Sequence, residues 1–236
     1  MHLEKEHLEL AIICYQIAIE YTSTDYERMK IYELLSWIYL SEMRSFAVDR
    51  YKQVEYIRMA IKYQKLQLEN SLLYHFTEIL RIPKLMQWIA KNYESIDEYD
   101  DALIIYDRTL KMFEDQLHPP FDTILNILKK ILNIYKEQKH DLHSVLKYKI
   151  IQHKYIVRDA YETPFEEYNI NYIVDQRFEL RLRQETIFKS HIELAHRFLD
   201  VNDYYMGNEH LSEALELADK NNFGNPCPKE AEFLKE

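Results

Sequence analysis

Glycine is nearly absent from this chain, which has two glycines and six prolines among its 236 residues. Sharp chain reversals mostly use these two residue types, so few tight turns are expected. Gly207 and Gly224 lie apart from each other, which excludes a glycine-rich loop of the kind that cradles phosphate groups. A chain with so few helix breakers is expected to be helical throughout.

Cysteine and long apolar runs are also scarce. Cys14 lies within a helical pattern and Cys227 lies between two prolines, so we expect a reducing, cytoplasmic location and no disulfide framework. We expect Cys14 itself to be a buried core side chain. No apolar run approaches the roughly 18 residues that a membrane span needs, and the first residues lack the apolar core of a signal peptide.

Basic residues are fewer than acidic ones: the chain has 30 Lys and Arg residues, 40 Asp and Glu residues and a formal net charge of −10. Because binding to a phosphate backbone depends on a basic surface, this balance argues against nucleic acid as the main ligand. Apolar and aromatic side chains are plentiful, with 47% hydrophobic residues and 20 tyrosines. The chain can therefore bury a substantial core.

The clearest pattern lies in the segment 86–117, which predicts two antiparallel helices joined at 95–98. Small and apolar residues recur at helical spacing on both sides of the joint: Met86, Ile89, Ala90, Tyr93, then Tyr99, Ala102, Tyr106 and Leu110. Two stripes this close in the chain must face each other, and small residues such as Ala90 and Ala102 let helices approach to roughly 8–10 Å. Ser95 and Glu98 are spaced as a capping box for the second helix.

This order of residues resembles the tetratricopeptide (TPR) repeat, which has small residues at its eighth and twentieth places and aromatic residues at its eleventh, seventeenth and twenty-fourth. These places are filled here by Ala90, Ala102, Tyr93, Tyr99 and Tyr106. Thr109 stands where the family usually has alanine, and Met86 where it often has tryptophan. The resemblance implies an all-α fold, a right-handed α-solenoid of TPR-like antiparallel helix pairs, and a role in binding other proteins.

A repeat fold requires recurrence, because one helical hairpin cannot bury its face alone. The pattern returns in part before the central segment and again near the end: Leu35, Ser36, Tyr39, Ile57, Ala60, and then Leu194, Ala195, Phe198, Tyr204, Gly207, Leu211 and Ala214. After the central segment, Ile131, Leu132 and Tyr135 repeat the first stripe at an interval of 42 residues, against about 34 in ordinary repeats. With His118 and Pro119 in the joint, this interval resembles the long TPR variety of kinesin light chains.

We expect one irregular array over residues 1–222 and a short C-terminal tail over 223–236. Its repeats are predicted to be degenerate near 41–82 and near 155–187, where the pattern cannot be placed in register. Leu132 and Ala195 are 63 residues apart, too many for one ordinary repeat and too few for two, which predicts an extra or degenerate helix between them.

Two helix starts are marked by capping sequences. Thr24 and Glu27 have the spacing of a capping box. Thr163, Pro164 and Glu166 combine a cap, a proline in the first turn and a carboxylate that can reach back to the cap.

In TPR arrays, certain places of each first helix line a concave groove. Carried over by that resemblance, the groove residues are Lys30, Glu33, Trp37, Lys84, Gln87, Lys91, Glu94, Asn126, Lys129, Asn133, Lys136, Lys189, Ile192 and His196. Six of them are lysines, although the protein as a whole is acidic. We hypothesise that this groove binds an acidic peptide segment or a free C-terminus; the alternative is that lysines are simply spread over any helical surface.

Three classes of function follow. The first is a non-catalytic adaptor or scaffold that binds a peptide or protein segment, and the second is a TPR-type regulator that responds to a short signalling peptide. The third is a metal-dependent helical-bundle enzyme, since Glu4/His7 and Glu193/His196 have the Glu-x-x-His spacing of di-iron proteins. About one such pair is expected by chance, so no catalytic residue, metal or other cofactor is predicted.

The first helical pattern lacks a preceding partner helix. Its stripe of Leu8, Ala11, Tyr15 and Ala18 would be left exposed, and an exposed apolar stripe is a natural contact for a homodimer.

Overall fold

The computed structural model describes residues 2–43, 49–73, 81–114, 116, 119–162 and 172–221. Across these residues all regular secondary structure is helical, so the prediction of an all-α protein is confirmed. The chain divides into two compact units, Met1–Gln116 and Leu117–Glu236.

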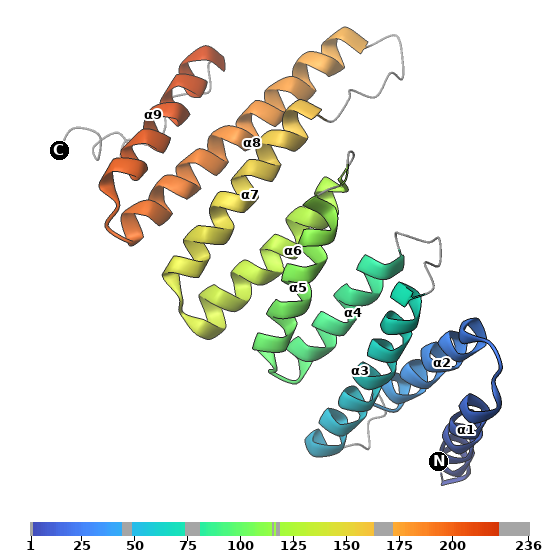
Figure 1. Ribbon diagram of the computed structural model, residues 1–236. Helices are drawn as coiled ribbons and strands as arrows, with labels where there is room; N and C mark the ends of the chain where they lie inside the picture. Colours follow the sequence, from blue (N-terminus) through green and yellow to red (C-terminus); the bar gives the residue numbers. More distant parts are fainter. Residues whose placement is uncertain are drawn as a thin grey trace. The chain divides into compact units, whose positions relative to one another are not determined.

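Unit 1 is a row of helices in which each one packs against the next in the sequence (Figure 1). Its helices are α1 (His2–Tyr21), α2 (Asp25–Met43), α3 (Arg50–Leu73), α4 (Arg81–Ser95) and α5 (Tyr99–Glu114). Pro83 lies in the first turn of α4, where a missing backbone N–H costs nothing. Residues 70–73 belong to α3 and 81–82 to α4, and the part between them lies outside the described residues.

The predicted hairpin of 86–117 is formed by α4 and α5. Met86, Ile89, Ala90 and Ala102 are each 0% exposed, as expected for small and apolar residues at a close helix contact. The predicted capping box is wrong. Ser95 still belongs to α4 and donates its hydroxyl to the carbonyl of Asn92 at 2.7 Å, while the Glu98 carbonyl accepts the first backbone hydrogen bond of α5 from Ala102.

The core of α1, α2 and α3 centres on Leu35, Tyr39, Ala60 and Tyr63. Helix α1 contributes its side chains at i, i+3 and i+7, namely Ile12, Tyr15 and Ile19. This register turns Cys14 outward, so Cys14 is exposed and the expectation that it is buried is wrong.

The orientation of α1 also decides which of its side chains are exposed for the predicted homodimer contact. Tyr15 packs within the chain, and Ala11 and Ala18 are half-buried. Among the described side chains of α1, the large exposed hydrophobic ones form a different stripe, Leu10, Ile13, Ile17 and Tyr21. A homodimer through α1 stays a prediction, but its contact would have to use this other face.

Of the capping box predicted at the start of α2, the bond from the Glu27 backbone to the Thr24 side chain is confirmed, whereas the Glu27 carboxylate meets the Thr24 hydroxyl and not its backbone N–H. The Thr24 hydroxyl lies 2.8 Å from the Glu27 carboxylate, and the Glu27 backbone N–H donates to Thr24 Oγ1 at 3.3 Å. This satisfies one of the backbone donors that every helix leaves open at its N-terminus.

Unit 2 consists of α6 (Phe121–Asn133), a π-helical segment η1 (Ile134–Lys139), α7 (Leu142–Glu162), α8 (Tyr172–Asp200) and α9 (Tyr204–Asn221). Helix α7 packs against α6 and α8, and α8 packs against α9. The wide turn of η1 ends at His140, whose backbone is left-handed with φ of 51°. The backbone N–H of His140 donates a hydrogen bond to the carbonyl of Tyr135 and so ends the segment.

The additional helix expected between Leu132 and Ala195 does not occur among the described residues. The interval is spanned by longer helices instead, since α7 has 21 residues and α8 has 29. The predicted cap at Thr163 to Glu166 and the predicted tail 223–236 lie outside the described residues. The extent of the array and its degenerate repeats stay predictions.

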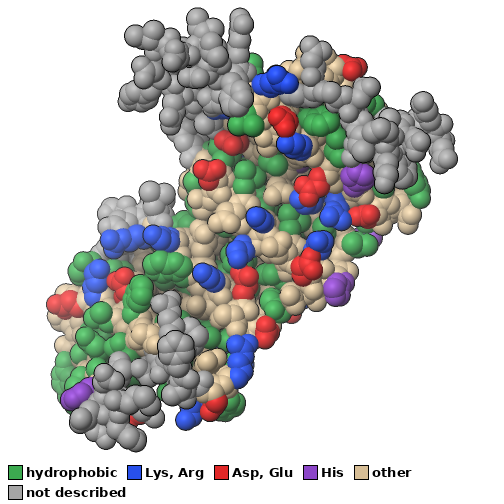
Figure 2. Space-filling view, turned by 180° about the vertical axis from the view of Figure 1, so that it is seen from behind, with side chains coloured by type: hydrophobic (Ala, Val, Ile, Leu, Met, Phe, Trp, Pro, Cys, Tyr) green, Lys and Arg blue, Asp and Glu red, His purple; other side chains and the backbone are tan. Residues whose placement is uncertain are grey.

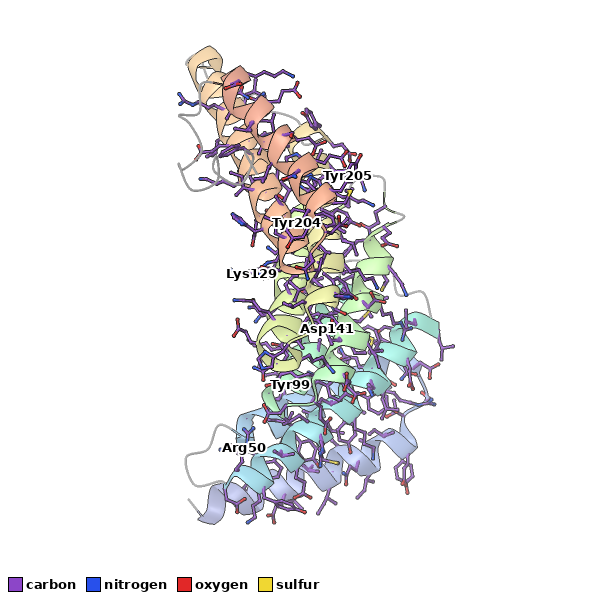
Figure 3. The ribbon with its side chains drawn as sticks, turned by 90° about the vertical axis from the view of Figure 1, so that its left-hand side faces the viewer. Arg50, Tyr99, Lys129, Asp141, Tyr204 and Tyr205 are labelled. Atoms are coloured by element: carbon purple, nitrogen blue, oxygen red, sulfur yellow. The ribbon has the colours of Figure 1, made fainter. Side chains whose placement is uncertain are left out.

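The hairpins α4–α5 and α8–α9 have equivalent turns. Ile96, Asp97 and Glu98 donate to the carbonyls of residues 93, 94 and 93, and Val201, Asn202 and Asp203 donate in the same order to 198, 199 and 198. Asp97 and Asn202 share a φ of 62°, a left-handed position that suits Asp and Asn. Tyr99 and Tyr204, labelled in Figure 3, then donate to the side chains of Asp97 and Asn202. The recurrence of the repeat is therefore confirmed for these two hairpins.

Candidate peptide-binding groove

A groove runs between α2 and α4, with α3 contributing to its lining. It consists of two adjoining cavities of ≈ 420 Å³ and ≈ 360 Å³. The cavities share the four lining residues Glu33, Gln67, Leu85 and Trp88. Of the predicted groove residues, the structure brings five together here: Lys30, Glu33 and Trp37 from α2, and Lys84 and Lys91 from α4.

Both tryptophans of the chain line this groove. Trp37 is 54% exposed and Trp88 is 42% exposed, and both border the smaller cavity. The Lys84 ammonium lies 5.6 Å from the centre of the Trp88 ring, a cation–π contact that fixes the indole. Trp88 was not among the predicted groove residues. The available signal was its place off the buried stripe of α4, since an indole on a polar helix face needs another partner.

The groove is locally basic. Lys30, Arg81, Lys84 and Lys91 line the cavities together with one carboxylate, Glu33. Lys30 lies 3.5 Å from Glu33 and over the ring of Tyr26 at 5.7 Å. The groove therefore carries an excess of positive charge in a chain whose formal net charge is −10.

Side-chain amides line the cavities beside these charges. Gln64 is 3% exposed and accepts a hydrogen bond of 2.9 Å from the Asn92 amide, which ties α3 to α4. Gln67 borders both cavities. Amide side chains carry donors and acceptors together, so they are suited to a peptide backbone.

Two predicted groove residues of α4 lie elsewhere. Gln87 is half-buried and lines neither cavity. Glu94 also lines neither cavity, because its carboxylate accepts a hydrogen bond from the Tyr106 hydroxyl of α5. Burial and this hydrogen bond raise the pKa of Tyr106 above its usual range. Glu94 therefore links α4 to α5 within the hairpin.

The remaining predicted groove residues belong to unit 2. Asn126, Lys129 (labelled in Figure 3) and Asn133 are exposed along one face of α6. Lys136 follows in η1, where its ammonium pairs with Glu137 at 2.9 Å. On α8, Lys189 pairs with Glu185 at 2.6 Å, Ile192 is half-buried and His196 is exposed. A binding role for these seven residues stays a prediction.

Surface charge by itself does not mark a site in this protein. On the face seen in Figure 2, acidic and basic side chains are interspersed. Pairs such as Lys111 with Asp107, at 3.1 Å, are typical of a solvated helix surface and contribute little stability. The two exposed indoles therefore distinguish the groove more sharply than its lysines do.

The Glu-x-x-His pairs do not form a metal centre among the described residues. The Glu193 carboxylate binds the Lys149 ammonium at 2.6 Å, and His196 on the same helix is exposed. The side chain of Glu4 lies outside the described residues.

Comparison of the sequence with protein-family models and with curated proteins gives no match. The solved structures that match this chain include the following two. The crystal structure of BtubC (BKLC) from P. vanneervenii aligns over 96% of this chain and 79% of that one, with 12% identity and a TM-score of 0.43. The apo form of RapI aligns over 94% of this chain and 95% of that one, with 17% identity and a TM-score of 0.25. These values are too low to carry an argument about function, and the resemblance to kinesin light chains stays a prediction.

None of the described helices combines the length and the apolar character that crossing a membrane would require.

Proposed function

We propose that this protein is a non-catalytic interaction module that binds an extended segment of another protein in the groove between α2 and α4. The observation that carries this proposal is the exposure of both tryptophans on the wall of one cavity. An indole has a large apolar surface that is costly to leave in water. Tryptophan is also enriched among the few residues that dominate binding energy at interfaces.

The groove favours an acidic segment that carries at least one apolar or aromatic side chain. Four cationic side chains against one carboxylate attract negative charge, and each lysine can act as a point charge toward a carboxylate. The two indoles supply the apolar contact. The amides of Gln67 and Asn92 can face the peptide backbone, while Gln64 holds Asn92 in place.

The described lining of the two cavities lacks the Ser–His and Cys–His pairs of common hydrolases, which supports a binding role. Serines line the two cavities, but among their described lining residues there is no histidine or cysteine. A serine without an adjacent base is a weak nucleophile.

A short signalling peptide is the second candidate for the same groove. The observation that favours it is cavity size: ≈ 420 Å³ and ≈ 360 Å³ fall within the roughly 300–1,000 Å³ of small-ligand sites. A peptide of about five to ten residues that fits there should raise the melting temperature in a saturable way, by linkage. Equal or tighter binding by such a peptide than by longer segments would favour this regulator over an adaptor.

The test uses intrinsic fluorescence, because both tryptophans lie in the groove and report on it directly. A library of acidic peptides with one apolar residue, free of tryptophan, is titrated against the full chain, and a charge-reversed library serves as the comparison. We expect acidic members to change the tryptophan emission saturably. The double variant Lys84→Glu/Lys91→Glu should lose this response, whereas Lys111→Glu on α5 should keep it. No response in the native chain, or a response that survives the double reversal, would rule out the acidic-segment proposal.

A further inference from the structure

Three histidines from three successive helices of unit 2 lie together. They are His153 of α7, His191 of α8 and His210 of α9, and one nitrogen of each lies within 4.8 Å of the others. The rings of His153 and His191 are 4.2 Å apart between centroids. Sequence spacing gives no sign of this cluster, because the residues lie on different helices and meet only when the helices pack.

Glu213, one turn along α9 from His210, completes a tight triangle of ligand atoms. Nδ1 of His191 lies 3.1 Å from Nδ1 of His210, and Oε2 of Glu213 lies 3.0 Å and 3.1 Å from these two nitrogens. Tetrahedral Zn²⁺ has bonds of about 2.0–2.1 Å to nitrogen and oxygen ligands, which puts two ligands about 3.3 Å apart. The three edges of this triangle are close to that separation, and a ring nitrogen of His153 lies within 4.8 Å of those of His191 and His210.

Hydrogen bonds alone cannot satisfy all three edges of this triangle. A neutral imidazole carries a proton on only one of its nitrogens, and a carboxylate carries none. If both Nδ1 atoms of His191 and His210 are protonated, two N–H groups face each other. If only one is protonated, the other nitrogen presents a lone pair to the Glu213 carboxylate. A single cation within reach of all three atoms removes both conflicts.

The surroundings resemble those of ligating histidines in general. Nδ1 of His153 lies 2.9 Å from the Ser190 hydroxyl, which orients the ring and leaves its other nitrogen for a ligand. Phe198 stacks on the His210 ring at 5.5 Å between centroids and shields one side. The side chain of Glu213 is 49% exposed while that of His191 is 10% exposed, so an ion can enter from the Glu213 side.

We propose that His153, His191, His210 and Glu213 form a binding site for a divalent transition-metal ion, for which Zn²⁺ is the best match. Imidazole and carboxylate ligands suit Zn²⁺, and four protein ligands make a closed, structural site. Since the ligands come from α7, α8 and α9, the ion fastens the last hairpin of unit 2 to the helix before it. The site is separate from the groove of unit 1 and does not depend on the proposed peptide binding.

The test is Zn²⁺ titration of the full chain by calorimetry, after removal of any affinity tag and of bound metal with a chelator. We expect one ion per chain and a melting temperature that rises with Zn²⁺. Co²⁺ in its place should give the intense visible absorption of a four-coordinate ion. Ser190→Ala should weaken binding about 10–100-fold, as loss of a supporting hydrogen bond does, and His191→Ala should weaken it at least as much.

Matched controls are His143→Ala and His196→Ala, which remove exposed histidines of the same unit and should leave Zn²⁺ affinity unchanged. If His191→Ala fails to fold by circular dichroism, Glu213→Gln replaces it, because Glu213 is half exposed and its loss should still weaken binding about 10-fold or more. The proposal is overturned if the native chain binds no Zn²⁺, or if the folded ligand variants bind it as tightly as the native chain.

Discussion

Trp37 of α2 and Trp88 of α4 are 51 residues apart in the sequence, yet they border the same cavity and both are exposed. We predict that Trp37→Ala and Trp88→Ala each weaken binding of an acidic peptide by about 2 kcal/mol, the size of an interface hot spot. Their stability should change by no more than about 0.5 kcal/mol, because exposed side chains contribute little to folding. Calorimetric titration of the peptide measures the first effect and urea unfolding the second.

Tyr205→Ala is the control for these variants, since Tyr205 is an aromatic residue 78% exposed on α9. Its affinity for the peptide should equal that of the native chain. If all three variants weaken binding equally, the groove is not the binding site.

The contact between α4 and α5 depends on a small side chain at Ala90, which is 0% exposed. Ala90→Leu should destabilise the protein by about 1–3 kcal/mol, because the added atoms force neighbours from their preferred positions. Lys91→Leu adds the same side chain at the next, exposed position and should change stability by less than about 0.5 kcal/mol. Urea unfolding of both variants checks this, and equal stability of the two would contradict the close contact.

The start of α2 offers a test of local stabilisation. Thr24→Ala removes the hydroxyl that accepts the Glu27 N–H and should cost about 1 kcal/mol. Ser23→Ala alters the neighbouring exposed residue and should be neutral. The free energies of unfolding in urea are compared, and a loss of similar size in both variants would mean that the cap is not the cause.

The raised pKa of Tyr106 predicts how the free energy of unfolding falls at high pH. Its folded-state pKa is raised by burial and by the bond to Glu94, whereas the unfolded chain releases this proton near pH 10. The stabilisation is therefore complete below about pH 10 and is lost as the pH rises above it. Relative to Tyr106→Phe, the native chain should lose up to about 1.4 kcal/mol more per pH unit in this range.

Tyr21→Phe is the control for this measurement, because Tyr21 is 83% exposed. It should follow the native pH dependence. A Tyr106→Phe variant whose urea midpoint falls as steeply with pH as the native one would refute the assignment.

The parts of the fold set by neighbouring residues could be predicted from the sequence. The α4–α5 hairpin follows from the spacing of Ala90, Tyr93 and Ala102, and the cap of α2 from Thr24 and Glu27, because in both cases the residues that meet lie close together in the sequence. The cap of α5 could not be predicted, since it depends on the left-handed backbone of Asp97, which shifts the helix start past Ser95.

Features that depend on the packing of separate helices were missed. The interval between Leu132 and Ala195 cannot distinguish longer helices from additional ones, and α7 and α8 are longer. The roles proposed for Trp88 and for the cluster of His153, His191 and His210 depend on neighbours on other helices. Five of the fourteen expected groove residues meet in one groove because they occupy α2 and α4, which lie on either side of α3.

The wide turn of η1 has a consequence for how this chain tolerates changes in length. A π-helical turn holds about one residue more than an α-helical turn, and each residue of an α-helix turns the chain by about 100°. Deleting one residue within Ile134–Lys139 could thus be absorbed by restoring ordinary winding there, with His140 still ending the segment. Length variation in relatives of this protein should accordingly concentrate at this point and spare α6 and α7.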